Sequence, residues 1–272
     1  MNELRISRRT LTLGLSATAG LSVLSPATIV LAAPSGRDIM DKVAQTRKLK
    51  GSEAVIKMSI FNEKGQARER KLTMASKLFD GGKTEKRIYR FLSPADVEGT
   101  GVLVFDYEDK ADDIWIYLPA LRKTRRIVSS QRSKSFMGSE FSYGDLNIPA
   151  LDDFKYNVVK EESAGGEACF VVDSVPKDKA TADSEGYSKK TYWISKQKYV
   201  VRRGLYYDLG GKPLKELKAD NVKELDKGHY RPLRMEMVNK QNGRRSLFDS
   251  EKMAFAPDTK DDYFTTRYLE RT

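Results

Sequence analysis

Residues able to carry out acid–base or metal chemistry are few and scattered in this chain. Its one histidine, His229, stands alone in Lys-Gly-His-Tyr-Arg, so no histidine cluster with metal-ligand spacing exists. A Ser-His-Asp triad would need His229, and no nucleophile-elbow sequence accompanies it. The acidic pairs suit turns better than paired catalytic carboxylates; they are Asp112-Asp113, Asp152-Asp153 and Asp261-Asp262. We therefore predict no catalytic residue, no metal site and no cofactor, with an unrecognised hydrolase as the enzymatic alternative.

A group of aromatic and methionine side chains suits a different chemistry, the binding of flexible apolar molecules. Trp115 and Tyr117 stand at alternate positions of a strand-like segment and so share one face. Four more candidates lie further along, in an irregular segment: Phe136, Met137, Phe141 and Tyr143. Such side chains adapt to flexible chains, and burying an acyl chain gains roughly 0.8 kcal/mol per methylene without any ion pair. These six are candidate ligand-binding residues; the alternative is that they only fill the core.

The densest cationic run lies between these two groups. It consists of Arg122, Lys123, Arg125 and Arg126, with Arg132 and Lys134 nearby. One interpretation is a solvated strand end. The other is contact with anionic lipid headgroups or with the acidic surface of a membrane transporter.

The elements that position these residues are mainly strands, because most of the chain alternates apolar and polar residues. About a dozen such segments are separated by turn-forming residues; they cover 54–61, 70–78, 85–92, 102–107, 114–118, 124–128, 154–159, 169–175, 190–194, 200–207, 213–222, 233–238 and 245–255. Short connections favour antiparallel neighbours. A sheet of this size in one domain must close or curl strongly, and a large barrel or half-barrel can hold a ligand inside.

Two segments break the alternation. Residues 37–45 place apolar side chains at helical spacing behind Ser35, which predicts one short amphipathic helix, and almost no other helix is predicted. Residues 129–150 form a long irregular segment that contains Gly138, Gly144 and Pro149. Long irregular loops in compact domains are usually functional or disordered, and the aromatic content here argues against disorder. We expect this segment to cover the interior of the sheet.

Residues 1–33 have the layout of a twin-arginine signal peptide. Ser7-Arg8-Arg9 precedes a weakly apolar stretch that ends in the small residues Ala32-Ala33. An uncleaved membrane anchor is the alternative, which the length allows but the many small and hydroxylated residues disfavour. Cleavage after Ala32 or Ala33 would leave one domain in the periplasm, residues 34–272, preceded by Ala33 in the first case. Export also makes nucleic acid a poor partner, although the formal net charge of the chain is +11.

The only cysteine is Cys169, which lies in an apolar strand-like segment. The predicted mature chain therefore starts without a cysteine to acylate, so it is expected to be soluble and not lipid-anchored. It also cannot form an intramolecular disulfide, although its predicted compartment is oxidising. A buried, inert thiol is the simplest interpretation of Cys169.

Two segments resemble a known family. They are residues 113–127, Asp-Ile-Trp-Ile-Tyr-Leu-Pro-Ala-Leu-Arg-Lys-Thr-Arg-Arg-Ile, and residues 135–146, Ser-Phe-Met-Gly-Ser-Glu-Phe-Ser-Tyr-Gly-Asp-Leu. Together they are similar to the LolA/LolB-like outer membrane lipoprotein-sorting proteins, over most of residues 34–272. The resemblance implies a strongly curved antiparallel sheet of about 11–13 strands. This sheet would form an unclosed half β-barrel, with a short N-terminal helix and an apolar concave face covered by loops or helices.

The same resemblance implies a periplasmic carrier that binds lipoprotein acyl chains or another lipid on its concave face. It places the chain in a branch associated with inner-membrane transporters of the RND/MMPL type. The expected partners are lipid or lipoprotein cargo, such a transporter and, transiently, a membrane surface, with the protein a monomer. The alternative is a binding module of the same fold that senses envelope lipids or proteins for the transporter without ferrying cargo.

Overall fold

The computed structural model describes residues 33–147 and 150–271, and Pro34–Thr272 form one compact unit. The predicted signal peptide, apart from Ala33, and Pro149 of the predicted cover lie outside the described residues. Thirteen strands make up most of the described chain: β1 Gly51–Phe61, β2 Ala67–Phe79, β3 Thr84–Ser93, β4 Gly101–Tyr107, β5 Asp113–Leu118, β6 Lys123–Ile127, β7 Phe154–Ala164, β8 Glu167–Pro176, β9 Lys189–Ser195, β10 Val201–Tyr207, β11 Pro213–Asp226, β12 His229–Asn239 and β13 Arg245–Phe255.

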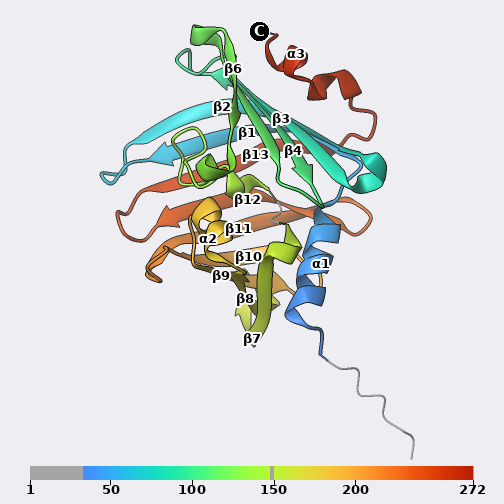
Figure 1. The fold of residues 1–272 in the computed structure, drawn as a ribbon, viewed down its shortest axis with the longest axis vertical. Coiled ribbons are helices and arrows are strands. Elements are labelled where there is room, and N and C mark those ends of the chain that lie inside the picture. Colours follow the sequence, from blue (N-terminus) through green and yellow to red (C-terminus); the bar gives the residue numbers. More distant parts are fainter. Residues whose placement is uncertain (1–32, 148–149, 272) are drawn as a thin grey trace, which may run out of the picture. The chain divides into compact units, whose positions relative to one another are not determined.

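All thirteen strands belong to one antiparallel sheet. Their order is β6-β5-β4-β3-β2-β1-β13-β12-β11-β10-β9-β8-β7, so each strand pairs with a chain neighbour except where β1 meets β13. Strands β6 and β7 end the order, and no pairing joins them in the described part of the chain. The sheet curls around one face without closing (Figure 1). This confirms the predicted half-barrel, and each predicted segment corresponds to one strand.

The alternation of side chains explains why the two faces differ. Along β1, Ala54, Ile56 and Met58 are buried on the concave face, and they join one large apolar cluster. On β3 the residues of that face change from polar to apolar along the strand, from Glu85 to Phe91. The concave face is therefore apolar over most of its area and charged at one end of β3.

The N-terminal helix α1 (Gly36–Arg47) is confirmed. The Ser35 side chain accepts a hydrogen bond from the backbone N–H of Asp38, whose carboxylate accepts in return from Ser35 N–H, which is a capping box. The apolar residues Ile39, Met40 and Val43 are buried against the concave cluster. The helix therefore covers part of the inner face of the sheet (Figure 1).

The structure also contains short helices that the sequence pattern did not predict. α2 (Lys179–Glu185) begins after Asp178, whose side chain accepts from Thr181 N–H, and ends at Gly186 with a positive φ of 78°. α3 (Thr266–Leu269) is a single turn near the C-terminus. Both are too short for an apolar periodicity to stand out, so local capping rather than patterning determines them.

The C-terminal segment covers the outer face of the sheet. The 3₁₀ turn η6 (Asp261–Phe264) and α3 bury Phe264 and Leu269 against Leu103 of β4. Cys169 of β8 is fully buried, and burial raises the pKa of its thiol, as expected for an inert cysteine. Among the described residues, no helix has both the length and the apolar character needed to cross a membrane.

A covered apolar site on the concave face

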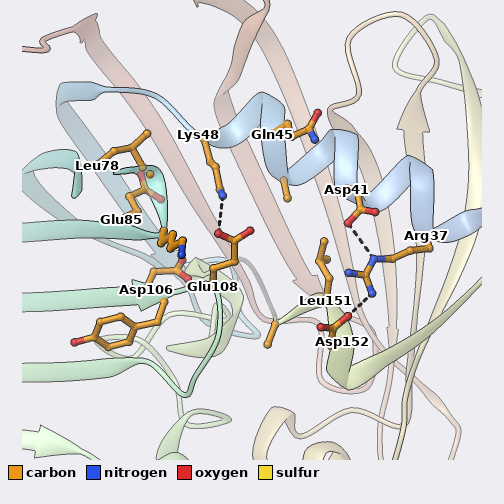
Figure 2. A pocket seen from close by; sticks show the side chains of 15 residues that line it. Arg37, Asp41, Gln45, Lys48, Leu78, Glu85, Asp106, Glu108, Leu151 and Asp152 are labelled. Atoms are coloured by element: carbon orange, nitrogen blue, oxygen red, sulfur yellow. Dashed lines mark hydrogen bonds and ion pairs between the residues drawn. The ribbon is translucent and has the colours of Figure 1, made fainter. Parts of the chain in front are cut away.

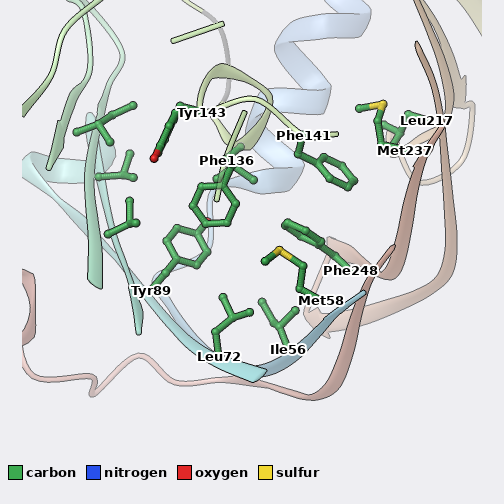
Figure 3. Close-up of a cluster of buried hydrophobic side chains, with 14 of the residues drawn as sticks. Ile56, Met58, Leu72, Tyr89, Phe136, Phe141, Tyr143, Leu217, Met237 and Phe248 are labelled. Atoms are coloured by element: carbon green, nitrogen blue, oxygen red, sulfur yellow. The ribbon is translucent and has the colours of Figure 1, made fainter. Parts of the chain in front are cut away.

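The segment between β6 and β7 folds into the concave face. We call residues 132–147 the cover. The cover holds one isolated antiparallel bridge, Ser135 to Ser142, and one 3₁₀ turn, η4 (Gly144–Leu146). Phe136, Phe141 and Tyr143 are all buried, and Phe136 is 0 % exposed. Figure 3 shows the Phe136 and Phe141 rings inside the curve of the sheet, facing Tyr89 and Phe248.

Aromatic contacts join the cover to the wall of the sheet. The Phe136 ring centroid lies 5.7 Å from that of Tyr89 and 6.2 Å from that of Phe248. The Phe141 and Phe248 centroids are only 4.5 Å apart. Such pairs stabilise by about 0.5–1.5 kcal/mol each beyond the burial of their area. The cover thus occupies the apolar concavity with its own rings.

The local sequence explains the shape of the cover. The Phe136 N–H donates to the Phe141 carbonyl at 2.7 Å, which closes a tight turn. Met137 and Gly138 inside this turn have positive φ values of 51° and 77°. The turn therefore projects Phe136 and Phe141 together, while Met137 packs half-buried beside them.

The middle of the cover is attached to β11, β12 and β13 through Glu140. Its backbone N–H donates to the Ser246 hydroxyl at 2.9 Å, and its carbonyl accepts from Lys215 at 2.6 Å. Its carboxylate accepts from Asn239 at 3.0 Å and pairs with Arg244 at 3.1 Å. Glu140 and Ser246 are buried, so this attachment is shielded from solvent.

The C-terminal end of the cover is attached to β3 and β4. Arg87 donates to the Leu146 carbonyl and to the Asn147 side chain, both at 2.7 Å, and pairs with Asp106 at 2.6 Å. Burial raises the pKa of the Asp106 carboxyl to about 7, although Arg87 acts in the opposite direction. Asn147 also donates to Asp112 at 2.6 Å.

A third attachment joins the cover to α2 and β9. Arg132 pairs with Asp112 at 2.7 Å and with Glu185 at 3.4 Å, and Glu185 pairs with Lys190 at 2.8 Å. Burial alone would raise the pKa of Glu185, but Lys190 and Arg132 hold it below its ordinary value. All the described attachments of the cover to the sheet run through side chains, because no strand pairing joins the two. An element held in this way can leave without breaking the sheet.

Not all of the candidate ligand-binding residues come together. Phe136, Met137, Phe141 and Tyr143 lie with the concave cluster, whereas Trp115 and Tyr117 belong to the outer cluster. The Trp115 ring lies 5.0 Å from that of Phe105. Because side chains alternate along β5, its neighbours Ile114 and Ile116 supply the concave face instead. The structure therefore places Trp115 and Tyr117 away from the concave face.

The predicted basic run lies on the edge strand β6 and the turn before it. Its side chains are exposed at Arg122, Lys123, Arg125 and Arg126. Arg126 pairs with Asp113 of β5, while the other three have no ion pair within the described residues. Leu121, in the same turn, is 59 % exposed. The run therefore faces solvent beside an exposed apolar side chain.

The groups considered for catalysis have structural partners. The His229 ring lies 3.3 Å from the Thr46 carbonyl at the end of α1. Of the acidic pairs, Asp112 and Asp113 bind arginines, and Asp152 pairs with Arg37 at 2.5 Å. No cluster of His, Cys, Asp and Glu residues suited to a metal occurs in the described ranges.

A charged cavity of about 330 Å³ lies beside α1, next to the covered site. Arg37, Lys48 and Glu108 line it, together with Asp106. Lys48 and Glu108 pair across it at 3.3 Å (Figure 2). Its polar lining distinguishes it from the apolar concave face.

Sequence reasoning missed the polar residues that hold the cover. Arg87 shares the inward face of β3 with Tyr89 and Phe91, so the period-two pattern could have marked it as a charge inside the sheet. Ser246 and Asn239 gave no such signal, because a serine or asparagine in a strand is common on either face. Only the long-range contacts of Glu140 reveal their role.

Comparisons with known proteins agree with this fold. A family model described as an uncharacterized protein matches residues 83–271. A crystal structure described as an outer membrane lipoprotein-sorting protein domain, from Vibrio parahaemolyticus, is 30% identical, with a TM-score of 0.80, and the match covers 87% of this chain and 98% of that one. A DUF1329 family protein from Desulfovibrio piger is also 30% identical, with a TM-score of 0.79 and coverage of 86% and 97%.

A more distant match shows the fold alone. It is a LolA superfamily protein from Nitrosomonas europaea, 20% identical, with a TM-score of 0.65 and coverage of 87% of this chain and 100% of that one. No curated protein matches the sequence.

Proposed function

Because this chain belongs to the LolA-like outer membrane lipoprotein-sorting protein family, we propose that it binds a lipophilic cargo in the periplasm, on the concave face of its sheet. The cargo would be the acyl chains of a lipoprotein or a lipid. The observation that carries the proposal is the cover itself. Its rings fill an apolar concavity, yet no strand pairing fixes it there.

Exchange of the cover for cargo is energetically reasonable. An acyl chain gains roughly 0.8 kcal/mol for each methylene that it buries. A chain of a dozen or more methylenes therefore offsets the ring contacts of Phe136 and Phe141 that it replaces. The polar groups of the cover would meet water on opening, so they would not be left unpaired.

The candidate residues of the cover then have two roles. In the closed state Phe136, Phe141 and Tyr143 keep the concavity dry and filled. In the loaded state the same side chains, with Met137, would line the inner side of the displaced cover against the cargo. A ligand role for Trp115 and Tyr117 would instead require the outer face and the departure of α3.

In this proposal residues 1–33 direct the chain to the periplasm, through twin-arginine export followed by cleavage. Exposed cations on β6 and its turn supply the proposed membrane contact, with either anionic headgroups or an RND/MMPL-type transporter. The double variant Arg122→Glu with Lys123→Glu should bind anionic vesicles more weakly than the wild type. Lys227→Glu, at the exposed β11–β12 turn, is the matched control. Equal binding by all three proteins would contradict a role for the basic run in membrane contact.

Mass spectrometry of organic extracts tests whether the protein carries a lipid. The purified protein should carry lipid in stoichiometric amount, and Phe141→Asp should lose it because a carboxylate on the inner side of the cover is costly to bury. Leu209→Asp, in an exposed turn, should keep the lipid. A protein that carries no lipid and never takes up a fluorescent acyl probe would contradict the proposal.

The second candidate function is sensing without ferrying. The polar contacts that hold the cover support it, because their release on cargo binding would change the surface that a membrane partner meets. Transfer of a fluorescent acyl probe between vesicles separates the two functions. A carrier accelerates transfer, whereas a sensor binds the probe without accelerating it. A hydrolase would instead turn over lipid esters in a manner lost in His229→Ala.

A further inference from the structure

The sheet is not continuous along its whole length. Strands β12 and β13 have eleven residues each, yet they pair with each other only from Arg234 to Val238. Residues 229–232 of β12 pair only with β11, and residues 250–255 of β13 pair only with β1. We call the unpaired stretch between residues 229–233 and 250–255 the β12–β13 seam.

Both sides of the seam carry the backbone groups of a strand edge. Beyond the last bridge, between Arg234 and Asp249, residues 251–255 pair with no strand other than β1, so their backbone groups that point away from β1 have no partner strand. Pro232 stands in the unpaired half of β12. Its nitrogen lies on the side of β11, opposite Val222, so the proline weakens the β11–β12 pairing and does not itself hold the seam open.

The two strands separate because each follows a different neighbour. At the start of β12, Arg231 donates to the Thr46 carbonyl at 3.0 Å and to the Arg47 carbonyl, so this half is tied to the C-terminal end of α1. The second half of β13 stays with β1 as far as Phe255. A bulge between Val55 and Ile56 bends the β1–β13 pair beside the seam.

A cavity of about 660 Å³ borders the seam and extends from it over β1, β2 and β3 to the C-terminal segment. Its lining includes Leu233 of β12, Ser250 and Lys252 of β13, and Tyr263 and Tyr268 of the C-terminal segment. Apolar side chains at its floor, Met74 and Met253, also pack against the concave cluster. Free strand edges, apolar side chains and two tyrosines around one cavity match the needs of an extended polypeptide: pairing for its backbone and contact for alternate side chains.

The charged side chains around the cavity differ in whether they have a bonding partner. Its two carboxylates are engaged, Glu251 with Lys71 at 3.0 Å and Glu53 with the Thr259 hydroxyl at 3.1 Å. Its lysines, Lys223 and Lys252, are exposed and have no ion pair within the described residues. Apart from Glu53, which keeps its charge, the charges at the seam without an ion pair are therefore positive, which favours an acidic occupant.

We propose that the β12–β13 seam binds an extended acidic peptide segment of a partner protein by strand addition. A hydrocarbon chain fits the seam less well, because it leaves the backbone groups of both edges unpaired. The site needs no lipid, so it can exist whether or not the concave face carries cargo.

Three matched peptides test the proposal with the purified protein. Each is a fluorescein-labelled nonapeptide of alternating threonine and valine; the first carries two aspartates, the second carries lysines in their place, and the third is the aspartate peptide with alternate amides N-methylated. Fluorescence anisotropy should show saturable binding of the first, and binding at least about tenfold weaker for the second and for the third, which can pair along one edge only. Hydrogen exchange should slow at residues 229–233 and 250–255 when the first peptide binds.

Variants identify the residues responsible. Lys223→Glu combined with Lys252→Glu should weaken the acidic peptide about tenfold, and Lys227→Glu should leave it unchanged. Ala254→Trp should block the cavity, because Ala254 is exposed and lines it, while Ala67→Trp at an exposed site on β2 should not.

Four results would overturn the proposal: no saturable binding of the acidic peptide, equal binding of all three peptides, protection outside the seam, or displacement of the peptide by a fatty acid. Protection of the seam that grows with protein concentration alone would assign it instead to a second copy of this chain.

Discussion

Ser246→Ala tests whether the cover opens when cargo binds. Ser246 is 0 % exposed, and its hydroxyl accepts the Glu140 N–H at 2.9 Å. Its loss leaves this N–H buried and unpaired in the closed state, at a cost of about 1–3 kcal/mol. In the open state the same N–H would meet water, so the cost would vanish. The substitution therefore shifts the balance towards the open state without removing an apolar contact.

The size of the shift fixes the expected binding result. If cargo binds only the open state, apparent affinity rises in proportion to the population of that state. A cost of about 1–3 kcal/mol corresponds to a rise of about 5- to 150-fold, at 1.36 kcal/mol per tenfold. Titration with a fluorescent long-chain fatty acid measures this affinity, and urea unfolding measures the accompanying loss of stability.

A second buried serine provides the control. Ser76 on β2 is also buried, and its hydroxyl bonds to that of Ser52 at 2.8 Å, away from the cover. Ser76→Ala should lower stability but leave the affinity for the fatty acid unchanged. Should Ser246→Ala behave in the same way, with lower stability and unchanged affinity, the cover does not move on binding and the reasoning fails.

Three further predictions concern the sheet and its attachments. Phe248→Ala removes the ring against which the cover packs and should lower the free energy of unfolding in urea by about 3–5 kcal/mol. A loss under about 1 kcal/mol would show that neighbouring side chains move to fill the space. The lowered pKa of Glu185 means that its ion pair with Lys190 stabilises the fold above the unfolded-state pKa and that this stability is lost as the pH falls below about 4.3. Glu185→Gln should therefore reduce the loss of unfolding free energy on acidification. An unchanged pH dependence would count against the pair. Gly101→Ala places a Cβ 2.6 Å from Leu269 Cδ1. The substitution should lower the free energy of unfolding by about 1–3 kcal/mol and expose the C-terminal segment to trypsin. Unchanged cleavage would mean that α3 adjusts without detaching.

The sheet was predictable because its pattern is regular. The β1 residues Ala54, Ile56 and Met58 alternate with polar neighbours, and short turns separate the strands, so both strand positions and antiparallel order follow from the sequence. The pairing of β1 with β13 joins the two ends of the domain, and no local signal specifies it. The seam escaped prediction for the same reason.

The site was predictable only in part. The irregular segment with Phe136 and Phe141 indicated a cover, because rings in a long loop need a surface to bury them. The direction of Trp115 and Tyr117 did not follow from the sequence, since alternation groups residues by face without saying which face is concave. The attachments of Glu140 and Arg87 depend on contacts between residues 59 to 106 positions apart, which no local pattern encodes.

Hydrogen exchange of the cover during cargo binding tests the central claim most directly. In the closed state Phe136, Ser139 and Glu140 each donate a backbone N–H to a partner at 3.0 Å or less. When a long-chain fatty acid saturates the protein, the account predicts faster exchange at these three amides, with unchanged protection in β1 and β2. Saturable binding with equal or slower exchange throughout the cover would contradict the claim that cargo takes its place.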